Sequence, residues 1–322
     1  MDAVQRMINR LEAGAATFEC SGCLSSLEPV TRTAIYTRLL YERLARKHQF
    51  ILDIYTNEGQ YWEQIFYVML LRFLGAPTNT EPFEKLARRV TYPTVSRHID
   101  SPEKLEALFI GTSGLLDLYP NDEYTQNMRV QWDYLAQKFG IQPMSAGEWK
   151  IAGIYPHNNP VLRMSQAAAV LSQPGFCFER ILACRNSEDA ARLLSHEASE
   201  YWSTHFIPSV PSPQLCKRIG RDKVDILTIN VIAPLQFSFG CYIDNDTLRD
   251  RALNLLDTIH PENNFKVRRW TNGGLIPKSA FDTQVLIHLG DEYCLKKRCR
   301  ECPVGRRMIK TLKETCKLEE NK

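Results

Sequence analysis

The residues with the clearest chemistry lie in one stretch near the C-terminus, EYCLKKRCRECPVGRR, at positions 292–307. Its three cysteines, Cys294, Cys299 and Cys302, are spaced C-x4-C-x2-C and stand among six lysines and arginines. Thiolates at such spacings bind zinc or iron–sulfur clusters, because a short loop can turn several sulfurs toward one point. Neighbouring cations lower thiol pKa values and favour the ligating form. The stretch therefore predicts a site for zinc or an iron–sulfur cluster, with three free thiols as the alternative.

A closed four-ligand site requires a fourth donor from elsewhere in the chain. The first candidate is Cys20, which forms a separate C-x2-C with Cys23 in FECSGCLSSL. The second candidate is Cys316, which follows the loop near the end of the sequence. We favour Cys20, because a ligand so distant along the chain would close a long loop and tie the N-terminus to the C-terminal lobe.

Basic residues gather at the same end of the chain and predict contact with nucleic acid. From Lys266 to Lys310 there are eleven lysines and arginines against four acidic residues, although the whole chain carries only +3. A positive end of this kind attracts phosphates, and a tryptophan beside it could stack on an unpaired base. The alternative is a solvated basic surface. The residues predicted to bind nucleic acid are Lys266, Arg268, Arg269, Trp270, Lys296, Lys297, Arg298, Arg300, Arg306 and Arg307, with Lys310 close behind.

A third set of residues predicts a buried polar site. Arg163 and Gln166 stand among apolar positions in NNPVLRMSQAAAV, and Glu106 lies in the apolar segment KLEALFIG. Buried polar groups usually satisfy other groups of the protein, so a ligand-binding or catalytic role is the minority interpretation. The chain has no G-x-x-x-x-G-K-[ST], G-x-G-x-x-G or G-x-S-x-G motif. No reaction and no catalytic residues follow from the sequence.

Helical hydrophobic periodicity runs through nearly the whole chain, and alternating strand patterns are almost absent. We therefore predict an all-α fold, an irregular multi-helix array in two packed lobes. The segment IPSVPSPQ (207–214) is the predicted linker, because its three prolines interrupt a helix. The predicted lobes are an N-terminal one at 1–206 and a C-terminal one at 215–322 with the cysteine loop. The predicted helices lie at 31–55, 57–77, 101–118, 121–140, 187–206, 222–240 and 245–259.

The chain is expected to be cytoplasmic and without a membrane partner. No apolar run reaches the roughly 18 residues that a membrane span needs. The N-terminus, MDAVQRMINRLEAG, lacks the regions of a signal peptide. The most apolar segment, 222–240, is expected to be a buried helix kinked before Pro234. In the cytoplasm most of the ten cysteines should be reduced thiols or metal ligands.

Several stretches resemble the DUF2851 family, uncharacterised bacterial proteins. In chain order they are YERLARK (41–47), TEPFEKLARR (80–89), KLEALFIGTSGLL (104–116), ASEYW (198–202), IPKSAFDTQ (276–284) and EYCLKKRCRECPVG (292–305). The resemblance implies no reaction, but it implies that the cysteine loop is a family feature. It also implies a further, β-rich N-terminal part in family members, near whose end this sequence begins, so that the chain corresponds to their C-terminal helical portion.

The cysteine loop also resembles, more loosely, the iron–sulfur loop of endonuclease III-like DNA glycosylases. In that loop basic residues and a Cys-Pro pair, here Cys302-Pro303, accompany the ligands. The glycosylases have a longer first arm and a nearby fourth cysteine, and this sequence shows no clear helix-hairpin-helix glycine motif. The resemblance therefore implies a cluster loop and not glycosylase activity.

Together these patterns favour a nucleic-acid-associated helical module with a structural zinc ion or iron–sulfur cluster. The first alternative is a protein–protein interaction or scaffold module whose cysteines bind nothing. The second is an enzyme of unknown reaction, which would need a concave pocket. The basic cluster and the cysteine spacing favour the first interpretation over the scaffold.

Overall fold

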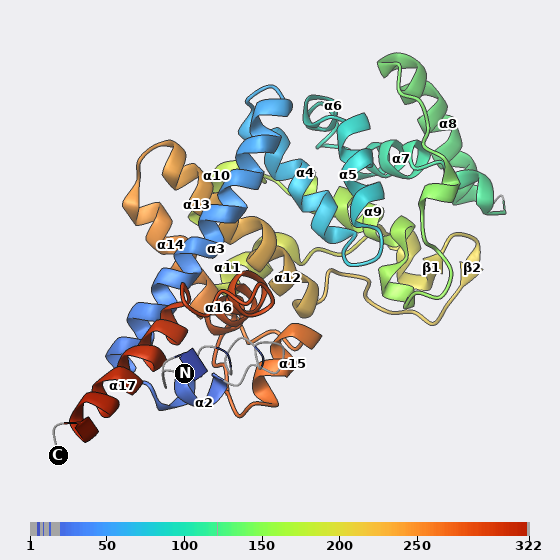
Figure 1. The fold of residues 1–322 in the computed structure, drawn as a ribbon. Helices are drawn as coiled ribbons and strands as arrows, with labels where there is room; N and C mark the ends of the chain where they lie inside the picture. Colours follow the sequence, from blue (N-terminus) through green and yellow to red (C-terminus); the bar gives the residue numbers. More distant parts are fainter. Residues whose placement is uncertain (1–4, 7–8, 10–12, 14–19, 121, 321–322) are drawn as a thin grey trace. The chain divides into compact units, whose positions relative to one another are not determined.

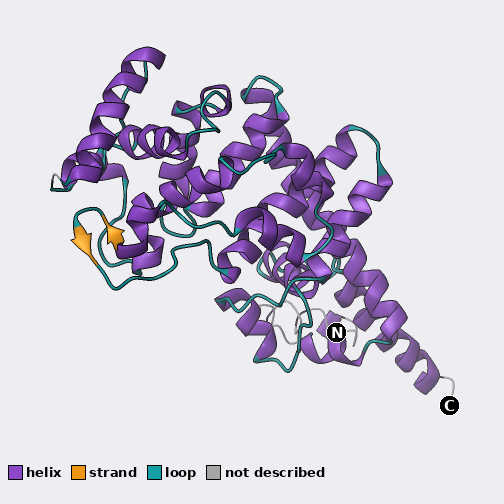
Figure 2. Ribbon diagram, turned by 180° about the vertical axis from the view of Figure 1, so that it is seen from behind, coloured by secondary structure: helices purple, strands orange, loops and turns teal. Residues whose placement is uncertain are grey.

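A computed structural model describes residues 5, 6, 9, 13, 20–120 and 122–320, with the backbone alone at 312–320. The fold is predominantly α-helical, as the periodicity predicts (Figure 2). Within the described residues the sheet content is one antiparallel pair, formed by β1 (His205–Ile207) and β2 (Val210–Pro211).

The chain folds into two compact units. Unit 1 combines residues 1–49 with residues 249–322, and unit 2 comprises residues 50–248. Both ends of the chain thus belong to the same unit. These limits differ from the predicted lobes at 1–206 and 215–322, because the predicted linker lies inside unit 2.

The proline-rich segment 207–214 is held in a hairpin and does not separate two lobes. The Ser212 N–H donates to the Thr204 carbonyl at 2.7 Å, and the Leu215 N–H donates to the Ser203 carbonyl at 2.8 Å. The Ser209 N–H donates to the Tyr201 hydroxyl at 2.7 Å. Proline excludes helix but is compatible with a short edge strand and a turn, so the segment folds back on its own neighbours.

Unit 2 is built around the apolar helix α4 (Trp62–Leu74), which is buried along most of its length. The sequence predicted a helix here, at 57–77. α4 packs against α5 and α12, and α7 packs against α8 and α9 (Figure 1). The other elements of this unit are α5 (Thr80–Arg89), α6 (Tyr92–Ser96), α7 (Pro102–Thr112), η2 (Leu116–Leu118), α8 (Glu123–Phe139), η3 (Ala146–Glu148), η4 (Pro156–Asn158), α9 (Pro160–Leu171), α10 (Phe178–Ala183), α11 (Ser187–Leu194), η5 (Glu200–Thr204), α12 (Arg221–Leu227), η6 (Thr228–Ile232) and α13 (Ala233–Tyr242).

Residues 221–242 form one continuous helical run, in which the π-helical turn η6 joins α12 to α13. The π turn lies directly before Pro234, where the sequence predicts a kink, because proline lacks the N–H of a regular helical bond. The run is long and apolar enough to cross a membrane, which the sequence reading did not expect. The protein buries 72 % of its most apolar window, the pattern of a core helix.

The helix predicted at 187–206 ends at Leu194. The Ser195 hydroxyl donates to the Ile219 carbonyl at 2.7 Å, and Glu197 pairs with Arg218 in an isolated β-bridge. Backbone pairing with residues 217–219 replaces the helical bonds, so the helix stops and a short 3-10 turn, η5, follows. This long-range pairing leaves no signal in the local periodicity.

Unit 1 contains helices from both ends of the chain, and α3 runs from this unit into residues of unit 2. α15 packs against α16, and α2 packs against α17. On α3 the side chains of Leu39, Leu40 and Leu44 are fully buried. The elements are α2 (Ser21–Ser26), α3 (Pro29–Asn57), α14 (Asp246–Asp257), α15 (Phe265–Thr271), α16 (Ala280–Leu289), η7 (Gly290–Cys294) and α17 (Pro303–Glu320).

Candidate metal centre

The cysteine loop is a tight connection between α16 and α17. Cys294 is the last residue of the π-helical turn η7, and Cys302 directly precedes α17. The loop is closed by backbone bonds from the Arg298 N–H to the Tyr293 carbonyl at 2.8 Å and from the Cys302 N–H to the Arg298 carbonyl at 3.0 Å. Cys294 and Cys302 are buried, at 6 % and 4 % exposure, while Cys299 is half-buried. Two of the three thiols therefore point away from solvent.

The fold also brings Cys20 to this loop. Cys20 directly precedes α2, and α2 packs against α17, whose first turn follows Cys302. The Cys20 side chain is hydrogen-bonded to the Cys294 thiol, and the Cys299 and Cys302 thiols lie near enough to influence it electrostatically. The four cysteines predicted as ligands thus lie in one cluster. Cys316, the second choice for the fourth ligand, lies where side chains are outside the described part of the structure.

The pKa values of Cys294 and Cys302 are raised above that of a free thiol. The hydrogen bond with Cys20, then burial, raises the pKa of Cys294, and the neighbouring thiols add to this shift. Burial raises the pKa of Cys302 to about 11, although the backbone N–H groups of Gly305 and Val304 favour its thiolate. Several adjacent thiols cannot ionise together without a counter-charge, whereas a metal cation deprotonates the thiols that coordinate it. The donor chemistry of this cluster therefore fits zinc or an iron–sulfur cluster.

The donor types of the cluster suit a metal, but the arrangement of its side chains does not form a coordination site. Within the described residues no three His, Cys, Asp or Glu side chains are arranged to hold a metal ion. Tetrahedral zinc with Zn–S bonds of roughly 2.3 Å places its sulfurs about 3.8 Å apart. Metal binding at this cluster therefore requires a rearrangement that brings the sulfurs to this spacing.

Gly305 has a role in the loop that the sequence reading missed. A Cβ atom at this position would lie 2.1 Å from the Cys299 carbonyl oxygen. Only glycine lets the first turn of α17 approach the Cys299 backbone so closely. The glycine three residues after Cys302 was visible in the sequence, but the atom it contacts could not be identified there.

Helix α3 anchors the turn that carries Cys294. The Tyr293 hydroxyl donates to Glu42 Oε2 at 2.7 Å, and Arg38 pairs with the same carboxylate at 2.9 Å. The buried His288 ring lies 3.4 Å from Glu42 Oε2. Burial opposes ionisation of Glu42, but these hydrogen bonds prevail and lower its pKa. Glu42 therefore links α3 to η7, a role that its place in YERLARK did not reveal.

The predicted nucleic-acid-binding residues divide by their partners. Lys266 pairs with Asp291 at 2.7 Å, Lys296 pairs with Glu292 at 2.6 Å, and Arg298 pairs with Glu301. Ion pairs with local acids reduce the charge that these three side chains offer to a phosphate. Arg300 donates to Gln5 Oε1 at 3.3 Å, and Arg269 is half-buried.

Four other basic residues remain exposed near the cysteine loop or on α15. Arg268 bonds to Asn263, and Arg306 bonds to the Arg300 carbonyl at 3.3 Å. Lys297 and Arg307 have no hydrogen-bond or ion-pair partner among the residues that the structure describes. These four side chains carry positive charge that no ion pair within the described residues offsets.

Trp270 cannot stack on a base as predicted, because its side chain is fully buried. It lies on α15, which packs against α16. The tryptophan follows two arginines, and the sequence reading assigned it to their exposed side. The helical period instead turns it inward with Val267, three residues earlier, which is also buried.

The buried polar residues of unit 2 form two networks. Glu106, which is 1 % exposed, accepts hydrogen bonds from Tyr124 at 2.9 Å, from Ser199 at 3.1 Å and from Ser165. Burial raises its pKa, and these hydroxyls oppose the shift.

Arg163 bonds to amide oxygens, at 2.8 Å to Gln166 and 2.9 Å to Asn158. Burial lowers the pKa of Arg163 to about 10. Gln166 in turn donates to the Lys217 carbonyl at 3.0 Å. In both networks the protein supplies these hydrogen-bond partners, as is usual for structural polar groups, while the buried Arg163 Nε has none among the described residues.

A family model described as a protein of unknown function, DUF2851, matches residues 1–265. The match includes the stretches at 41–47, 80–89, 104–116 and 198–202 and ends before the cysteine loop. No curated protein and no solved structure matches the chain.

Proposed function

The chain belongs to the DUF2851 family, and we propose that its unit 1 binds a zinc ion or an iron–sulfur cluster and, beside it, nucleic acid. The observation that carries the proposal is the meeting of Cys20 with the C-terminal loop. The hydrogen bond between Cys20 and Cys294 joins residues from opposite ends of the sequence. In a reduced compartment, four clustered thiols from two distant segments are a more common feature of metal sites than of cores.

The metal would act as a structural clamp. Cys20, Cys294, Cys299 and Cys302 would supply the four thiolates, and the N–H groups at the start of α17 would stabilise the one from Cys302. The positive charge of a metal would offset the hydrogen bond with Cys20 and the burial that raise the pKa values of Cys294 and Cys302. Thiolate ligation would also fix α2 to α17 through bonds stronger than helix packing alone.

Elemental analysis and an absorption spectrum of anaerobically purified protein test the clamp. We expect either zinc without visible absorption or iron with sulfide and broad visible absorption. Each of the substitutions Cys20→Ser, Cys294→Ser and Cys302→Ser should remove most of the bound metal. Cys216→Ser, at an exposed thiol of unit 2, is the control and should keep it.

Cys23→Ser is a sharper control, because Cys23 shares the C-x2-C with Cys20. It should retain the metal if Cys20 is the fourth ligand. Full metal loss in Cys23→Ser with retention in Cys20→Ser would reassign that ligand. Wild-type protein with neither iron nor zinc would exclude the centre and leave four free thiols.

The nucleic-acid part of the proposal rests on Arg268, Lys297, Arg306 and Arg307. If all four contact phosphates of duplex DNA, log affinity should fall against log salt with a slope of about −3.6, at roughly −0.9 per contact. Fluorescence anisotropy with single-stranded and duplex oligonucleotides over a salt series measures this slope. Because Trp270 is buried, the binding should depend on charge and not on stacking by this residue.

Two adjacent lysines supply a matched pair of variants. Lys297→Gln should reduce the magnitude of the slope by about 0.9, because it removes one phosphate contact. Lys296→Gln should change it little, because Lys296 is already paired with Glu292. Flat titrations at low salt would remove nucleic acid from the proposal and favour the scaffold interpretation.

A further inference from the structure

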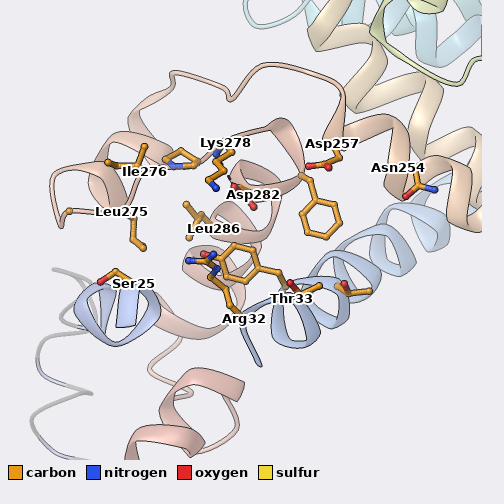
Figure 3. Close-up of a pocket in the computed structure, with 15 residues that line it drawn as sticks. Ser25, Arg32, Thr33, Asn254, Asp257, Leu275, Ile276, Lys278, Asp282 and Leu286 are labelled. Atoms are coloured by element: carbon orange, nitrogen blue, oxygen red, sulfur yellow. Dashed lines mark hydrogen bonds between the residues drawn. The ribbon is translucent and has the colours of Figure 1, made fainter. Parts of the chain in front are cut away.

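Unit 1 contains a cavity that the proposed function does not use. It has a volume of about 590 Å³ and is lined by α2, α3, α14, α16 and the loop 274–278 (Figure 3). This volume is within the range of small-molecule sites, which run from roughly 300 to 1,000 Å³. A mononucleotide would fit within it, so the cavity is large enough for an organic ligand.

The charged side chains of the cavity differ in how fully they are satisfied. Asp257 Oδ1 accepts a hydrogen bond from the Ser279 hydroxyl at 2.8 Å, and Asp282 Oδ2 accepts one from the Lys278 N–H at 2.8 Å. The side chains of Arg32 and Lys278 have no hydrogen-bond or ion-pair partner within the described residues. Figure 3 shows Arg32 on the α3 wall and Lys278 on the wall formed by the loop. Both cations are therefore available to the acceptor groups of a ligand.

Two unpaired cations match a dianion better than a single carboxylate. A phosphate monoester carries a charge of about −1.5 to −2 at neutral pH and several strong acceptor oxygens, whereas a carboxylate carries one charge. Arginine and lysine are the usual side chains for phosphate recognition. Arg32 and Lys278 thus offer a phosphate monoester two cationic partners, while Asp257 and Asp282 bring the formal charge of the lining to zero.

The rest of the lining suits the organic part of a nucleotide. Tyr36, Leu275 and Leu286 are buried and form an apolar wall, on which a planar base could lie. Asp257 and Asp282 use one carboxylate oxygen each in the bonds above, so their other oxygens can accept from sugar hydroxyls. We propose that this cavity binds a nucleoside 5′-monophosphate, either free or as the phosphorylated end of a single strand.

Isothermal titration with adenosine 5′-monophosphate, adenosine and inorganic phosphate tests the proposal. We expect the monophosphate to bind at least roughly tenfold more tightly than adenosine, because adenosine lacks the charged hydrogen bonds of the phosphate. A single-stranded oligonucleotide with a 5′-phosphate, compared with the same strand carrying a 5′-hydroxyl, distinguishes a strand end from a free nucleotide. Equal binding of adenosine and its monophosphate, or no binding of either, would overturn the proposal.

Arg32→Gln and Lys278→Gln should each weaken monophosphate binding by roughly tenfold or more. Both side chains lack partners in the described structure, so their loss should not unfold the chain, and circular dichroism checks this. Arg97→Gln, at an exposed arginine of unit 2, is the control and should bind as wild type. Unchanged affinity in both cavity variants would also contradict the assignment.

This proposal rests on the cavity and not on the proposed function. Wild-type protein with neither iron nor zinc would contradict the metal centre, and a flat salt series with oligonucleotides would contradict the basic surface. Neither result would bear on the difference between adenosine and its monophosphate. The proposal for the cavity and the proposal for the metal centre can therefore be contradicted independently.

Discussion

At the scale of single residues, close backbone approach decides how the cysteine loop can form. Gly305 lies against the Cys299 carbonyl, and an added Cβ would come within 2.1 Å of it. The Cys299 carbonyl is part of the backbone, so the backbone itself would have to move to relieve this contact. The position of Cys299 therefore depends on a glycine, which has no side-chain functional group.

Gly305→Ala should destabilise unit 1 by about 1–3 kcal/mol, the usual cost of overpacking, and should lower its metal content. Gly22→Ala is the matched control, because Gly22 lies in α2 beside Cys20 and its added Cβ would meet no atom within 4 Å. Urea unfolding and elemental analysis measure both effects. Wild-type metal content and stability in Gly305→Ala would show that the loop is not held by this contact.

A buried lysine in unit 2 predicts a pH dependence. Lys223 donates to the carbonyls of Leu74 at 3.3 Å and Ala76 at 2.6 Å, at the end of α4. Burial, and then the charge of Arg163, lower its pKa from 10.5 to about 7. Between these two values the unfolded chain holds the proton more tightly than the folded chain. The free energy of unfolding should therefore rise with pH from about 7 toward 10, by up to about 1.4 kcal/mol per pH unit.

Lys223→Met isolates this effect, because it removes the titrating group and keeps much of the apolar stem. Urea denaturation of both proteins at pH 7 and pH 9 gives the comparison. The wild type should gain stability relative to the variant as pH rises. Parallel pH profiles would show that the carbonyls of α4 hold Lys223 charged throughout.

At the scale of elements, the hairpin at 205–211 replaces the predicted linker. Val210 and Leu215 are about half-exposed, so the segment is open to a protease even though its neighbours are bonded. Both sides of the segment belong to unit 2. This exposed segment therefore does not mark a boundary between the two units.

Limited proteolysis should cut first between residues 210 and 216, and the two fragments should elute together under native conditions. They should stay together because each contributes core helices to unit 2, such as α4 and α13. Gel filtration followed by denaturing mass spectrometry checks both points. Separation of the fragments after the first cut would restore the predicted boundary.

At the scale of the whole molecule, the N-terminal and C-terminal segments of the chain form one unit. Unit 1 is assembled from residues 1–49 and 249–322, so all of unit 2 is inserted between its two segments. A metal bound by Cys20 and the C-terminal loop would join these segments directly. Closing so long a loop has a large entropic cost, which strong ligand bonds can offset.

Metal binding should therefore stabilise unit 1 and leave unit 2 nearly unchanged. Hydrogen exchange by mass spectrometry, compared before and after metal removal with a chelator, measures this difference. Faster exchange is expected in residues 20–49 and 249–311, with little change in residues 62–242. A uniform change across both units would argue against a local clamp.

The sequence by itself determined the helical class and most helix positions, because hydrophobic periodicity acts within one element. α3, α8 and the apolar helical run through Pro234 follow from local hydrophobic pattern. The chemical types of the four clustered cysteines were also readable. Their spacing predicts a metal site from the sequence alone, with free thiols as the alternative.

Only the tertiary structure decided which distant residues meet and which side chains are buried. The burial of Trp270, the ion pairs of Lys266 and Lys296, and the contact of Gly305 depend on neighbours far along the chain or across a turn. The hairpin at 205–211 and the shared unit of both termini are likewise long-range. Local propensity contains no information about such contacts. Hydrophobic periodicity can therefore locate a helix but cannot identify the elements against which the helix packs.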